Sequence, residues 1–409
     1  MEATFRRTFS SFAVHNFRLY FLGQGISLCG TWMQTIALSW LVLQLTHSGA
    51  KLGLVTAAQF LPILLFGLLG GVIADRFDKR KVLYFTQSML GILALLLGLL
   101  VVNHVVQLWE VYVIAACMGM TTVIDNPSRQ TFVVEMVGPE RLRNAISLNS
   151  TIVNLARIIG PSFAAIIIAT VGVGECFLIN AASYIAVLIA LALMRKRELR
   201  PTPPAKNDES GGVVQGLKYV WSEPRLRSTL LMMVIIGTFT YEFPVVMPLF
   251  ATITLHGNAA TYSAISAAMG LGAVVGGLYT AGKKEIAQSL LITVAVLFGL
   301  SMMLISIMPT LITALLLIVV MGMLSIIFIA LGNTTLQLTS QPQMRGRVMS
   351  LWSMAFQGTT PIGGPIIGVL IDHTNPRIGI FVGGLAALVA AIAGTLATRR
   401  SKKLQINTD

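Results

Sequence analysis

The chain has 409 residues, of which 55% are hydrophobic and only 11% are charged, and its formal net charge is +13. Soluble domains carry roughly 25% charged residues. Apolar runs recur along the whole length, and each is long enough to cross a bilayer core of roughly 30 Å. This composition excludes an ordinary soluble protein. The sequence also lacks the short alternating segments that are typical of membrane β-barrels.

Twelve membrane-spanning helices are predicted, so the expected fold class is an all-α integral membrane protein. The expected spans are 18–44, 52–74, 82–102, 108–128, 145–170, 175–194, 228–254, 260–281, 286–307, 310–334, 347–371 and 377–397. The first apolar helix follows Arg6, Arg7 and Arg18 and is too long for the apolar core of a signal peptide, so no cleaved leader is expected.

The distribution of basic residues predicts the orientation of the spans. If the N-terminus is inside, 26 of the 29 Lys and Arg residues fall in inner segments; Lys51 and Arg377 fall in outer loops, and Arg157 falls within a span. Cytoplasmic segments of membrane proteins carry an excess of Lys and Arg. We therefore expect a multi-pass protein of the bacterial inner (plasma) membrane with both termini in the cytoplasm. The net positive charge then requires no nucleic-acid partner.

One long polar break divides the chain. Residues 195–224 are rich in proline, glycine and charged side chains and are interpreted as a cytoplasmic linker. It would join an N-terminal six-helix bundle, residues 1–194, to a C-terminal one, residues 225–409. Within it, Val213–Trp221 is expected to form a short interfacial helix that leads into the seventh span.

An internal repeat relates the two halves. The first half contains Arg141–Arg143 followed by Gly160-Pro161. The second half contains Arg345–Arg347 followed by Gly364-Pro365, so each of the two motifs recurs 204 residues later in the chain. A duplicated six-helix unit is typical of parallel-repeat transporters. The two bundles are therefore expected to be pseudo-symmetric.

A charged loop lies between the second and third spans. Its run from Asp75 to Lys81 must lie in water or among headgroups, because ionisable side chains are costly in hydrocarbon, and this predicts a tight hairpin. Gly71, Asp75, Arg76 and Arg80 have the spacing Gly-x-x-x-Asp-Arg-x-x-x-Arg. We expect the arginines to pair with acids on adjacent helices, with Asp125 as the natural partner, and we predict that these residues control conformational gating.

The loop resembles the signature Gly-x-x-x-Asp-Arg-x-Gly-Arg-Arg of the major facilitator superfamily, and departs from it at Asp78 and Lys79. Asn16–Gln24, Gln59–Pro62 and Arg141–Asn149 are similar to segments of the branch called drug:proton antiporter family 3, which contains enterobactin exporters and macrolide and tetracycline efflux pumps. The resemblance covers nearly the whole chain. It implies two six-helix bundles with one central cavity that opens alternately to each side.

Small residues in the fifth span form a second motif. Ala156, Gly160, Pro161, Ala164 and Ala165 are similar to the antiporter motif Gly-x-x-x-Gly-Pro-x-x-Gly-Gly, with alanine at three of the glycine positions. Small side chains on one face let two helices approach closely, and an internal proline permits a kink. In the family this motif is associated with exporters, and we assign Gly160 and Pro161 to gating. Generic close packing is the alternative.

Two ionisable side chains are expected within the membrane, Arg157 near the midplane of the fifth span and Glu242 in the seventh. Such a charge is a functional hypothesis by default. Pro244 and Pro248 lie close to Glu242 and loosen its helix. Because exchange of a proton for substrate needs a tunable acid, we predict that Glu242 binds the proton and that a nearby Arg157 modulates it. A structural ion pair or a polar cavity lining is the alternative.

Polar and aromatic residues within the spans are predicted to line a central substrate cavity. The candidates are Gln24, Trp32, Gln34, Asn154, Tyr241 and Asn333. The 19 methionines and 19 phenylalanines also favour an adaptable apolar cavity.

Enzymatic signatures are missing: the sequence has no phosphate-binding loop for ATP, no nucleophile elbow and no His-x-x-x-His pair for zinc. We therefore predict no enzymatic activity, no cofactor and no metal site. The predicted function is export of a small hydrophobic or amphipathic molecule, a drug or a siderophore, by proton antiport in a monomer. An importer or lysophospholipid flippase on the same fold is the alternative. A non-transporting membrane sensor or scaffold is the rival of another class.

Overall fold

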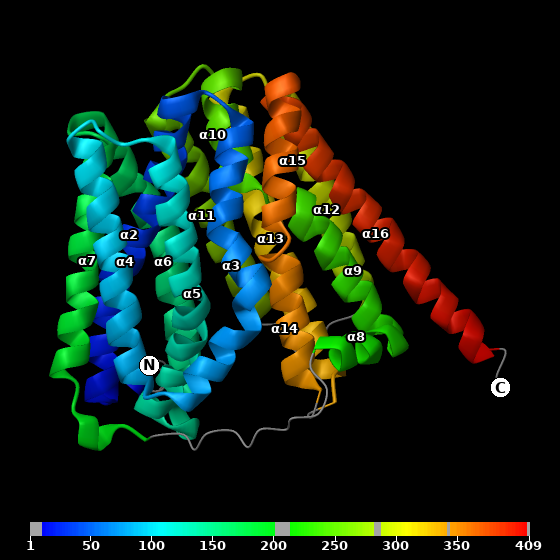
Figure 1. Ribbon diagram of the computed structural model, residues 1–409. Helices are drawn as coiled ribbons and strands as arrows, with labels where there is room; N and C mark the ends of the chain where they lie inside the picture. Colours follow the sequence, from blue (N-terminus) through cyan, green and yellow to red (C-terminus); the bar gives the residue numbers. More distant parts are fainter. Residues whose placement is uncertain (1–9, 201–212, 282–287, 342–343, 407–409) are drawn as a thin grey trace, which may run out of the picture. The chain divides into compact units, whose positions relative to one another are not determined.

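The computed structural model describes residues 10–200, 213–281, 288–341 and 344–406, and all secondary structure in them is helical (Figure 1). The first elements are η1 (Ser10–Ala13), α2 (His15–Thr46), α3 (Gly49–Arg76), α4 (Lys79–Val102), α5 (Leu108–Val137), α6 (Pro139–Thr170), α7 (Val173–Leu193) and η2 (Lys196–Glu198). The later elements are α8 (Val213–Ser222), α9 (Pro224–Phe239), α10 (Phe243–Leu249), the π-helical η3 (Phe250–Thr254), α11 (Ala259–Ala281), α12 (Gln288–Ile307), α13 (Leu311–Thr339), α14 (Arg345–Phe356), α15 (Thr360–His373) and α16 (Pro376–Ile406).

These helices supply 12 segments that are long and apolar enough to cross a bilayer. Their bounds follow the predicted spans closely, so the twelve-span all-α fold is confirmed. The short helix predicted before the seventh span is present as α8.

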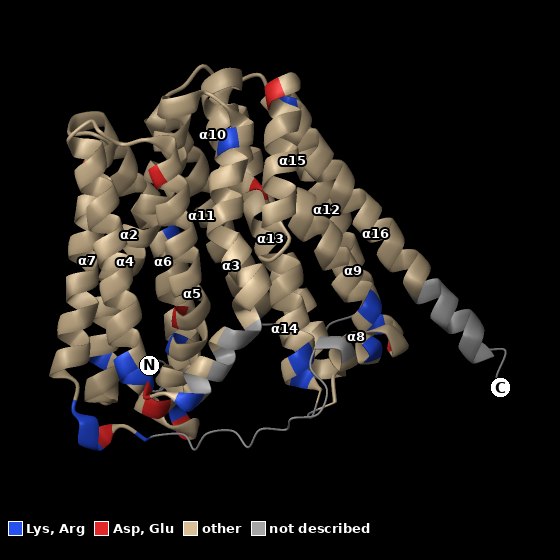
Figure 2. Ribbon diagram, in the orientation of Figure 1, with Lys and Arg blue, Asp and Glu red and all other residues tan. Residues whose placement is uncertain are grey.

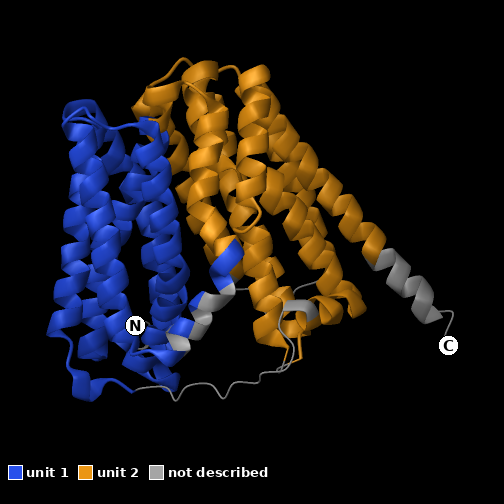
Figure 3. Cartoon of the chain, viewed as in Figure 1, with its two compact units in different colours: residues 1–41, 65–207 blue, residues 42–64, 208–409 orange. Residues whose placement is uncertain are grey.

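The chain packs as two compact units (Figure 3). Unit 1 contains residues 1–41 and 65–207, and unit 2 contains residues 42–64 and 208–409. The helix α3 is therefore divided: its first part belongs to unit 2 and its last part to unit 1. The division falls close to Pro62, which lies inside this helix.

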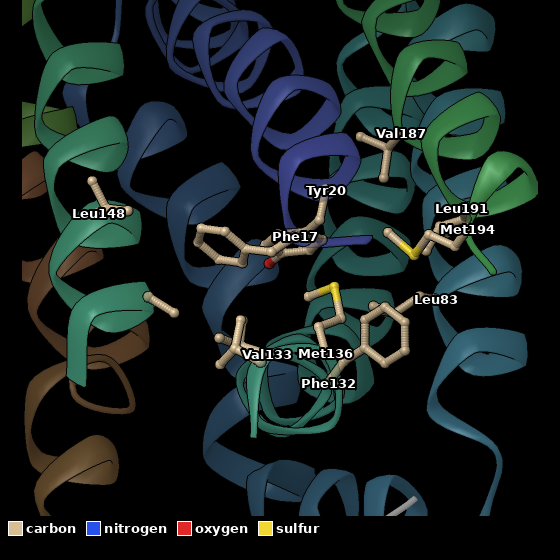
Figure 4. Packing of buried hydrophobic residues seen from close by; sticks show 12 residues of the cluster. Phe17, Tyr20, Leu83, Phe132, Val133, Met136, Leu148, Val187, Leu191 and Met194 are labelled. Carbon is tan, nitrogen blue, oxygen red and sulfur yellow. The ribbon is translucent and has the colours of Figure 1, made fainter. Parts of the chain in front are cut away.

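One apolar cluster joins five helices of unit 1 beside the first turns of α2 (Figure 4). Phe17 and Tyr20 of α2 meet Leu83 of α4, Phe132 of α5 and Leu191 of α7, and none of these is more than 2% exposed. Close side-chain packing is the main force that holds helices together in lipid. The cluster therefore gives this end of unit 1 a rigid base.

Most of the described Lys and Arg residues gather at one end of each unit, and in unit 1 this is the end where α2 begins (Figure 2). The charged loop differs from its prediction here, because two of its cations are buried. Lys79 and Arg80 are 7% and 8% exposed. Lys79 Nζ lies 2.8 Å from a carboxylate oxygen of Glu135 on α5.

Arg80 is buried because it caps another helix. Its Nε and Nη2 donate to the backbone carbonyl of Leu191, and Nη2 also donates to that of Ala192, both in the last turn of α7. The last carbonyls of a helix have no intrahelical donors and carry partial negative charge, so a guanidinium stabilises them. The expectation that the whole run lies in water is therefore wrong for these two residues.

The departure of the loop from the family pattern at Asp78 has a local structural reason. Asp78 is the N-cap of α4, and its carboxylate accepts the N–H of Lys81 at 3.1 Å. An aspartate N-cap satisfies one of the free N–H groups at a helix start and is worth roughly 0.5–2 kcal/mol over alanine. The aspartate therefore fixes where α4 begins.

Substituting glutamine for Glu135 should destabilise unit 1, because Lys79 would keep a buried charge without a counter-ion. Breaking a buried ion pair from one side costs about 3–5 kcal/mol. Thermal unfolding of the purified protein should therefore occur at a clearly lower temperature than for the wild type.

The matched control is Glu140→Gln. The Glu140 carboxylate lies 3.4 Å from Arg200, but these side chains are 70% and 65% exposed, so its loss should change unfolding little. Equal unfolding temperatures for the two variants would contradict the structural role of the Lys79–Glu135 pair.

Candidate functional site: a buried carboxyl between two broken helices

Span seven is broken near its middle. Thr240, Tyr241 and Glu242 separate α9 from α10. The N–H groups of Thr240 and Tyr241 both donate to the carbonyl of Ile236, at 2.8 and 3.2 Å, and so close α9. Pro244 has no N–H with which to continue the helical ladder. The loosening that the prolines predicted is thus confirmed, and Glu242 is the N-cap residue of α10.

Span eleven is broken as well. Residues Gln357–Thr359 form a turn between α14 and α15. Pro361 stands in the first turn of α15, where a proline costs no hydrogen bond and its fixed φ suits the helix. The start of α15 therefore carries the partial positive charge of a helix N-terminus within the span.

The carboxyl of Glu242 lies against the first turns of α15. Glu242 is 0% exposed. A Cβ on Gly363 would come within 2.7 Å of its Oε1, and a Cβ on Gly364 within 3.3 Å of its Oε2. The side chain of Thr360 also reaches the carboxyl. The two glycines therefore leave the space that the carboxyl fills.

Neither oxygen of the Glu242 carboxyl has a hydrogen-bond partner of good geometry among the described residues. The effective penalty for burying an ionised carboxylate in a protein is several kcal/mol. A helix N-terminus returns about 2 kcal/mol at most. The surroundings of Glu242 therefore suit a neutral, protonated acid in this conformation, and a charged one would need water or a rearrangement.

The first part of α3 packs directly on α15 within unit 2. A Cβ on Gly53 would collide with the carbonyl of Gly364, and a Cβ on Gly368 would collide with the carbonyl of Gly49. The two helices thus touch backbone to backbone, as small residues permit in membranes. Gly364 contacts both α3 and the carboxyl of Glu242, so the helix contact and the acid share one residue.

Asp372, near the end of α15, closes the same contact. Its carboxylate accepts from the Ser48 hydroxyl at 2.6 Å, the Gly49 N–H at 2.6 Å and the Ala50 N–H at 3.0 Å. A carboxylate at a helix start is favourable, because it satisfies free N–H groups and meets the positive end of the dipole. Here the cap of α3 comes from another helix and ties the two together.

Tyr241, a predicted cavity residue, lies in an aromatic cluster beside the break in span seven. Its hydroxyl donates to the carbonyl of Ser325 on α13 at 2.7 Å. Its ring centroid lies 5.3 Å from that of Phe356, 5.6 Å from that of Phe243 and 5.7 Å from that of Phe298. Such tilted and edge-on contacts are favourable between aromatic rings. Tyr241 is half-buried, so its predicted contact with substrate stays a prediction.

Two other predicted cavity residues lie within the helix packing of unit 1. Gln34 is buried, accepts from Asn180 Nδ2 at 2.6 Å and donates to the sulfur of Met118 at 3.3 Å. Gln24 is only 3% exposed. In this conformation neither side chain presents a free polar surface to a substrate.

Asn154 and Asn333 are half-buried, and each bonds within its own helix. Asn154 Nδ2 donates to the carbonyl of Ser150 at 3.0 Å, and Asn333 Oδ1 accepts from Gln337 Nε2. Both amides keep further hydrogen-bonding capacity. Their role in a cavity therefore stays a prediction.

Arg157 lies over the ring of Trp32, with its guanidinium carbon 5.0 Å from the ring centroid. This is the geometry of a cation–π contact, which is stronger when desolvated. Both residues belong to unit 1, whereas Glu242 belongs to unit 2. The predicted modulation of Glu242 by Arg157 stays a prediction.

The small residues of the fifth span pack α6 against α2. A Cβ on Gly160 would lie 2.7 Å from the carbonyl oxygen of Cys29 and 2.9 Å from the N of Met33. Pro161 lies inside α6, which continues through it from Pro139 to Thr170. The motif therefore acts as a close helix contact in this conformation.

Asp125 is buried and paired, but not with the arginines of the loop. It accepts from the Thr86 hydroxyl at 2.7 Å and from Gln87 Nε2 at 2.8 Å, and Arg129 Nε lies 3.6 Å away. The predicted pairing with Arg80 is wrong. Arg80 bonds to the end of α7, whereas Asp125 is paired with Thr86 and Gln87 of α4 and with Arg129 of α5. Arg76 is exposed. The side-chain surroundings of Gly71 and Asp75 lie outside the described structure.

Sequence reasoning missed Thr360, Asp372 and Glu135. The turn signals around Thr360, with Gly358 before it and Pro361 after it, could have predicted the second break. Asp372 could have been noticed as an acid at the outer end of a span whose neighbouring loops carry few charges. Glu135 had no comparable signal, because an acid near a span end is ordinarily solvated.

Comparison with known proteins gives the family. The family model described as transmembrane secretion effector matches residues 6–407, nearly the whole chain. The chain belongs to this family of the major facilitator superfamily. The protein therefore has the fold of a transporter and is not an enzyme.

Several relatives are named transporters. The chain is 25% identical to the multidrug efflux pump Tap of Mycolicibacterium fortuitum over 90% of this chain and 92% of that protein. It is 25% identical to the enterobactin exporter of Citrobacter koseri over 92% and 90% of the two chains. The staphyloferrin A transporter of Staphylococcus aureus is 30% identical to this chain, but the match covers only 43% of this chain and 45% of that relative.

Solved structures share the fold. A POT family transporter in complex with a thioalcohol-conjugated peptide aligns with a TM-score of 0.76 at 14% identity, over 94% of this chain and 96% of that one. A bacterial homologue of the human lysosomal transporter Spinster aligns with a TM-score of 0.72 at 15% identity, over the same shares of the two chains. At this identity the likeness concerns the fold alone.

Replacing Gly364 with alanine should weaken the contact between α3 and α15, because the new methyl group would enter the space between Gly53 and Glu242. The contact can be followed by disulfide formation between Ser48→Cys and Asp372→Cys, in a chain whose native cysteines are replaced by alanine. We expect the cross-linked fraction to fall several-fold.

Gly346→Ala is the control for this experiment, because a Cβ at Gly346 would meet nothing within 4 Å. It should leave cross-linking unchanged. Unchanged cross-linking in the Gly364→Ala chain would show that α3 and α15 do not depend on backbone contact at this point.

Proposed function

We propose that this protein exports a small hydrophobic or amphipathic molecule, a siderophore or a drug, in exchange for protons. The names of relatives that match nine-tenths of the chain, an enterobactin exporter and a multidrug efflux pump, support export and this substrate range. The protein works as a monomer by alternating access, in a bacterial inner membrane with both termini in the cytoplasm.

The observation that carries the proton part of the proposal is the carboxyl of Glu242, which is fully buried, has no ion pair among the described residues and is reached by the side chain of Thr360. It lies where two broken spans meet, and intramembrane breaks are where transporters of several folds hold substrates and coupling ions. An acid at such a place binds a proton when it is sealed from water and releases it when water enters. Glu242 is therefore the proton-binding residue of the exchange.

The contact between α3 and α15 is the gate that the proton controls. Gly364 contacts Gly53 on one side and the Glu242 carboxyl on the other. With Glu242 protonated, the contact stays closed and Asp372 holds the start of α3. Loss of the proton leaves a buried charge, which costs several kcal/mol. A change of roughly 5.5 kcal/mol is enough to shift the equilibrium between the closed and the open gate from 1:99 to 99:1, and the two energies are therefore comparable. Deprotonation is thus strong enough to open the gate.

The orientation rests on the distribution of charge. Most of the described Lys and Arg residues of each unit gather at one end (Figure 2), and segments of membrane proteins that are rich in Lys and Arg face the cytoplasm. In this orientation one proton moving inward across 100 mV releases about 2.3 kcal/mol, which supports an outward solute gradient of about 40-fold.

Glu242→Gln should abolish proton-coupled export while leaving the protein folded, since glutamine fills the same space but cannot exchange a proton. The substrate is first selected with a growth-inhibition panel, in which cells with and without the protein are exposed to a macrolide, a tetracycline and a catecholate siderophore. Export of that substrate by cells is then measured as a function of pH.

Glu175→Gln, which removes a carboxylate from the first turn of α7, is the control and should retain the pH dependence. Export by the Glu242→Gln protein with the pH profile of the wild type would remove this residue from the mechanism.

Direction is tested in inside-out vesicles. Acidification of the lumen should drive uptake of the selected substrate, because the lumen corresponds to the cell exterior and protons leave as substrate enters. A protonophore should abolish the uptake. Substrate release under the same gradient would instead indicate an importer on this fold.

A further inference from the structure

A basic hollow lies in unit 1, at the end of the unit where α2 begins. It encloses about 750 Å³, within the range of 300–1,000 Å³ that is typical of ligand pockets. Three separate segments line it: the start of α2, the turn from α5 into α6, and the chain that follows α7. Five arginines contribute to its lining, namely Arg18, Arg141, Arg195, Arg197 and Arg200.

Backbone interactions hold the walls of this hollow together. Asn16 Nδ2 donates to the carbonyl of Arg195 at 3.0 Å, and the N–H of Arg195 donates back to Asn16 Oδ1 at 2.9 Å. The N–H of Arg200 donates to the carbonyl of Glu135 at 2.9 Å, and the Ser11 hydroxyl donates to that of Arg141 at 3.2 Å. Hydrogen bonds to the main chain of Arg141, Arg195 and Arg200 therefore hold the segments together, in addition to the ion pair between Arg200 and Glu140.

The charges of the hollow do not balance. Its two acids are each engaged by one arginine: Glu198 lies 2.9 Å from Arg195, and Glu140 lies 3.4 Å from Arg200. Arg18, Arg141 and Arg197 have no ion pair among the described residues. The lining thus keeps a net charge of +3, taking His15 as neutral, from five arginines and two glutamates. A concave surface of one sign concentrates ions of the opposite sign.

The residue types indicate which anion fits. A guanidinium presents a planar fork of donors that matches the oxygens of a phosphate group. Apolar side chains, among them Val14, Met136 and Leu199, share the lining. Arg18 and Arg141 stand in the first turns of α2 and α6, both of them membrane spans, so the hollow lies near the level of the headgroups. A ligand with a phosphate and an apolar part meets all of these conditions.

We propose that this hollow binds the phosphate group of an anionic phospholipid from the cytoplasmic leaflet, an assignment of leaflet that rests on the orientation given under Proposed function. Basic pockets on the cytoplasmic side of membrane proteins suit such headgroups. The bound phosphate lies among Arg18, Arg141 and Arg197, and the acyl chains leave past the apolar side chains.

Occupancy of the hollow acts on the charged loop through Glu135. The carbonyl of this residue accepts the N–H of Arg200, and its carboxylate pairs with Lys79. A phosphate held by Arg197 together with Arg18 of α2 and Arg141 of α6 fixes the chain after α7 in place, and so supports the Arg200–Glu135 bond at the base of the loop. The lipid is thus a structural ligand of unit 1 and not the transported substrate.

The test measures lipid binding to the purified full chain in neutral detergent, with phosphatidylglycerol, phosphatidylcholine and inorganic phosphate as separate probes. Retained lipid is counted by native mass spectrometry, and unfolding temperature is recorded in parallel. The test variant carries three substitutions together: Arg18→Gln, Arg141→Gln and Arg197→Gln. The matched control removes three exposed cations outside the hollow, Lys81→Gln, Lys218→Gln, Arg225→Gln.

Wild type and control should retain phosphatidylglycerol, prefer it to phosphatidylcholine and unfold at higher temperature with it. The test variant should bind it on the order of 100-fold more weakly, given about 1 kcal/mol for each basic residue near an anionic surface. A triple lysine variant at the same positions should bind with intermediate affinity, because it keeps the charge and loses the fork. It also reports on the site if the glutamine variant does not fold.

Equal lipid binding by the test and control variants would overturn the proposal. Stabilisation by inorganic phosphate that matches the effect of phosphatidylglycerol would also overturn it, in favour of a soluble phosphate ligand. The measurement uses no gradient and no transported substrate, so its failure is distinct from a failure of proton-coupled export.

Discussion

A charge that leaves water must be paired or neutralised, and the two units meet this constraint in opposite ways. Unit 1 pairs its buried charges: Lys79 with Glu135, Arg80 with the end of α7, and Asp125 with α4 and Arg129. Unit 2 buries the carboxyl of Glu242 without an ion pair among the described residues, although the side chain of Thr360 reaches it. Paired charges cost a great deal to separate, whereas a lone acid can change its charge with the water around it. In the proposed mechanism this difference keeps unit 1 rigid and lets unit 2 respond to the protonation of Glu242.

The responsive site depends on backbone geometry as much as on the acid. Two spans are broken at the same place, and glycines on α15 leave room for the carboxyl on one face and for α3 on another. A methyl group at Gly364 would disturb both contacts at once. In the proposed mechanism, loss of the Glu242 proton therefore acts on α3 through Gly364 alone.

Much of this architecture could be predicted from the sequence, since apolar length and basic loops determine where a chain crosses a bilayer. The break in span seven followed from Pro244 and Pro248, and the position of Glu242 within a membrane span followed from its place in an apolar run. The surroundings of Glu242 could not be predicted, because they come from α15, more than a hundred residues later in the chain. The burial of Lys79 and Arg80 was also hidden, because a cation next to a span end looks the same in sequence whether it is solvated or caps a distant helix. Gln34 illustrates the same limit. It was a candidate cavity residue, but it is buried in the helix packing because it bonds to Asn180, a partner that the sequence does not reveal.

The division of α3 between the two units has a mechanical consequence. A single continuous helix is anchored at its start by Asp372 in unit 2 and continues beyond residue 64 into unit 1. Pro62, beside that division, removes one backbone hydrogen bond and makes bending easier there than elsewhere in the helix. The part of α3 that belongs to unit 2 is therefore joined to the part that belongs to unit 1 close to the point where this helix bends most easily.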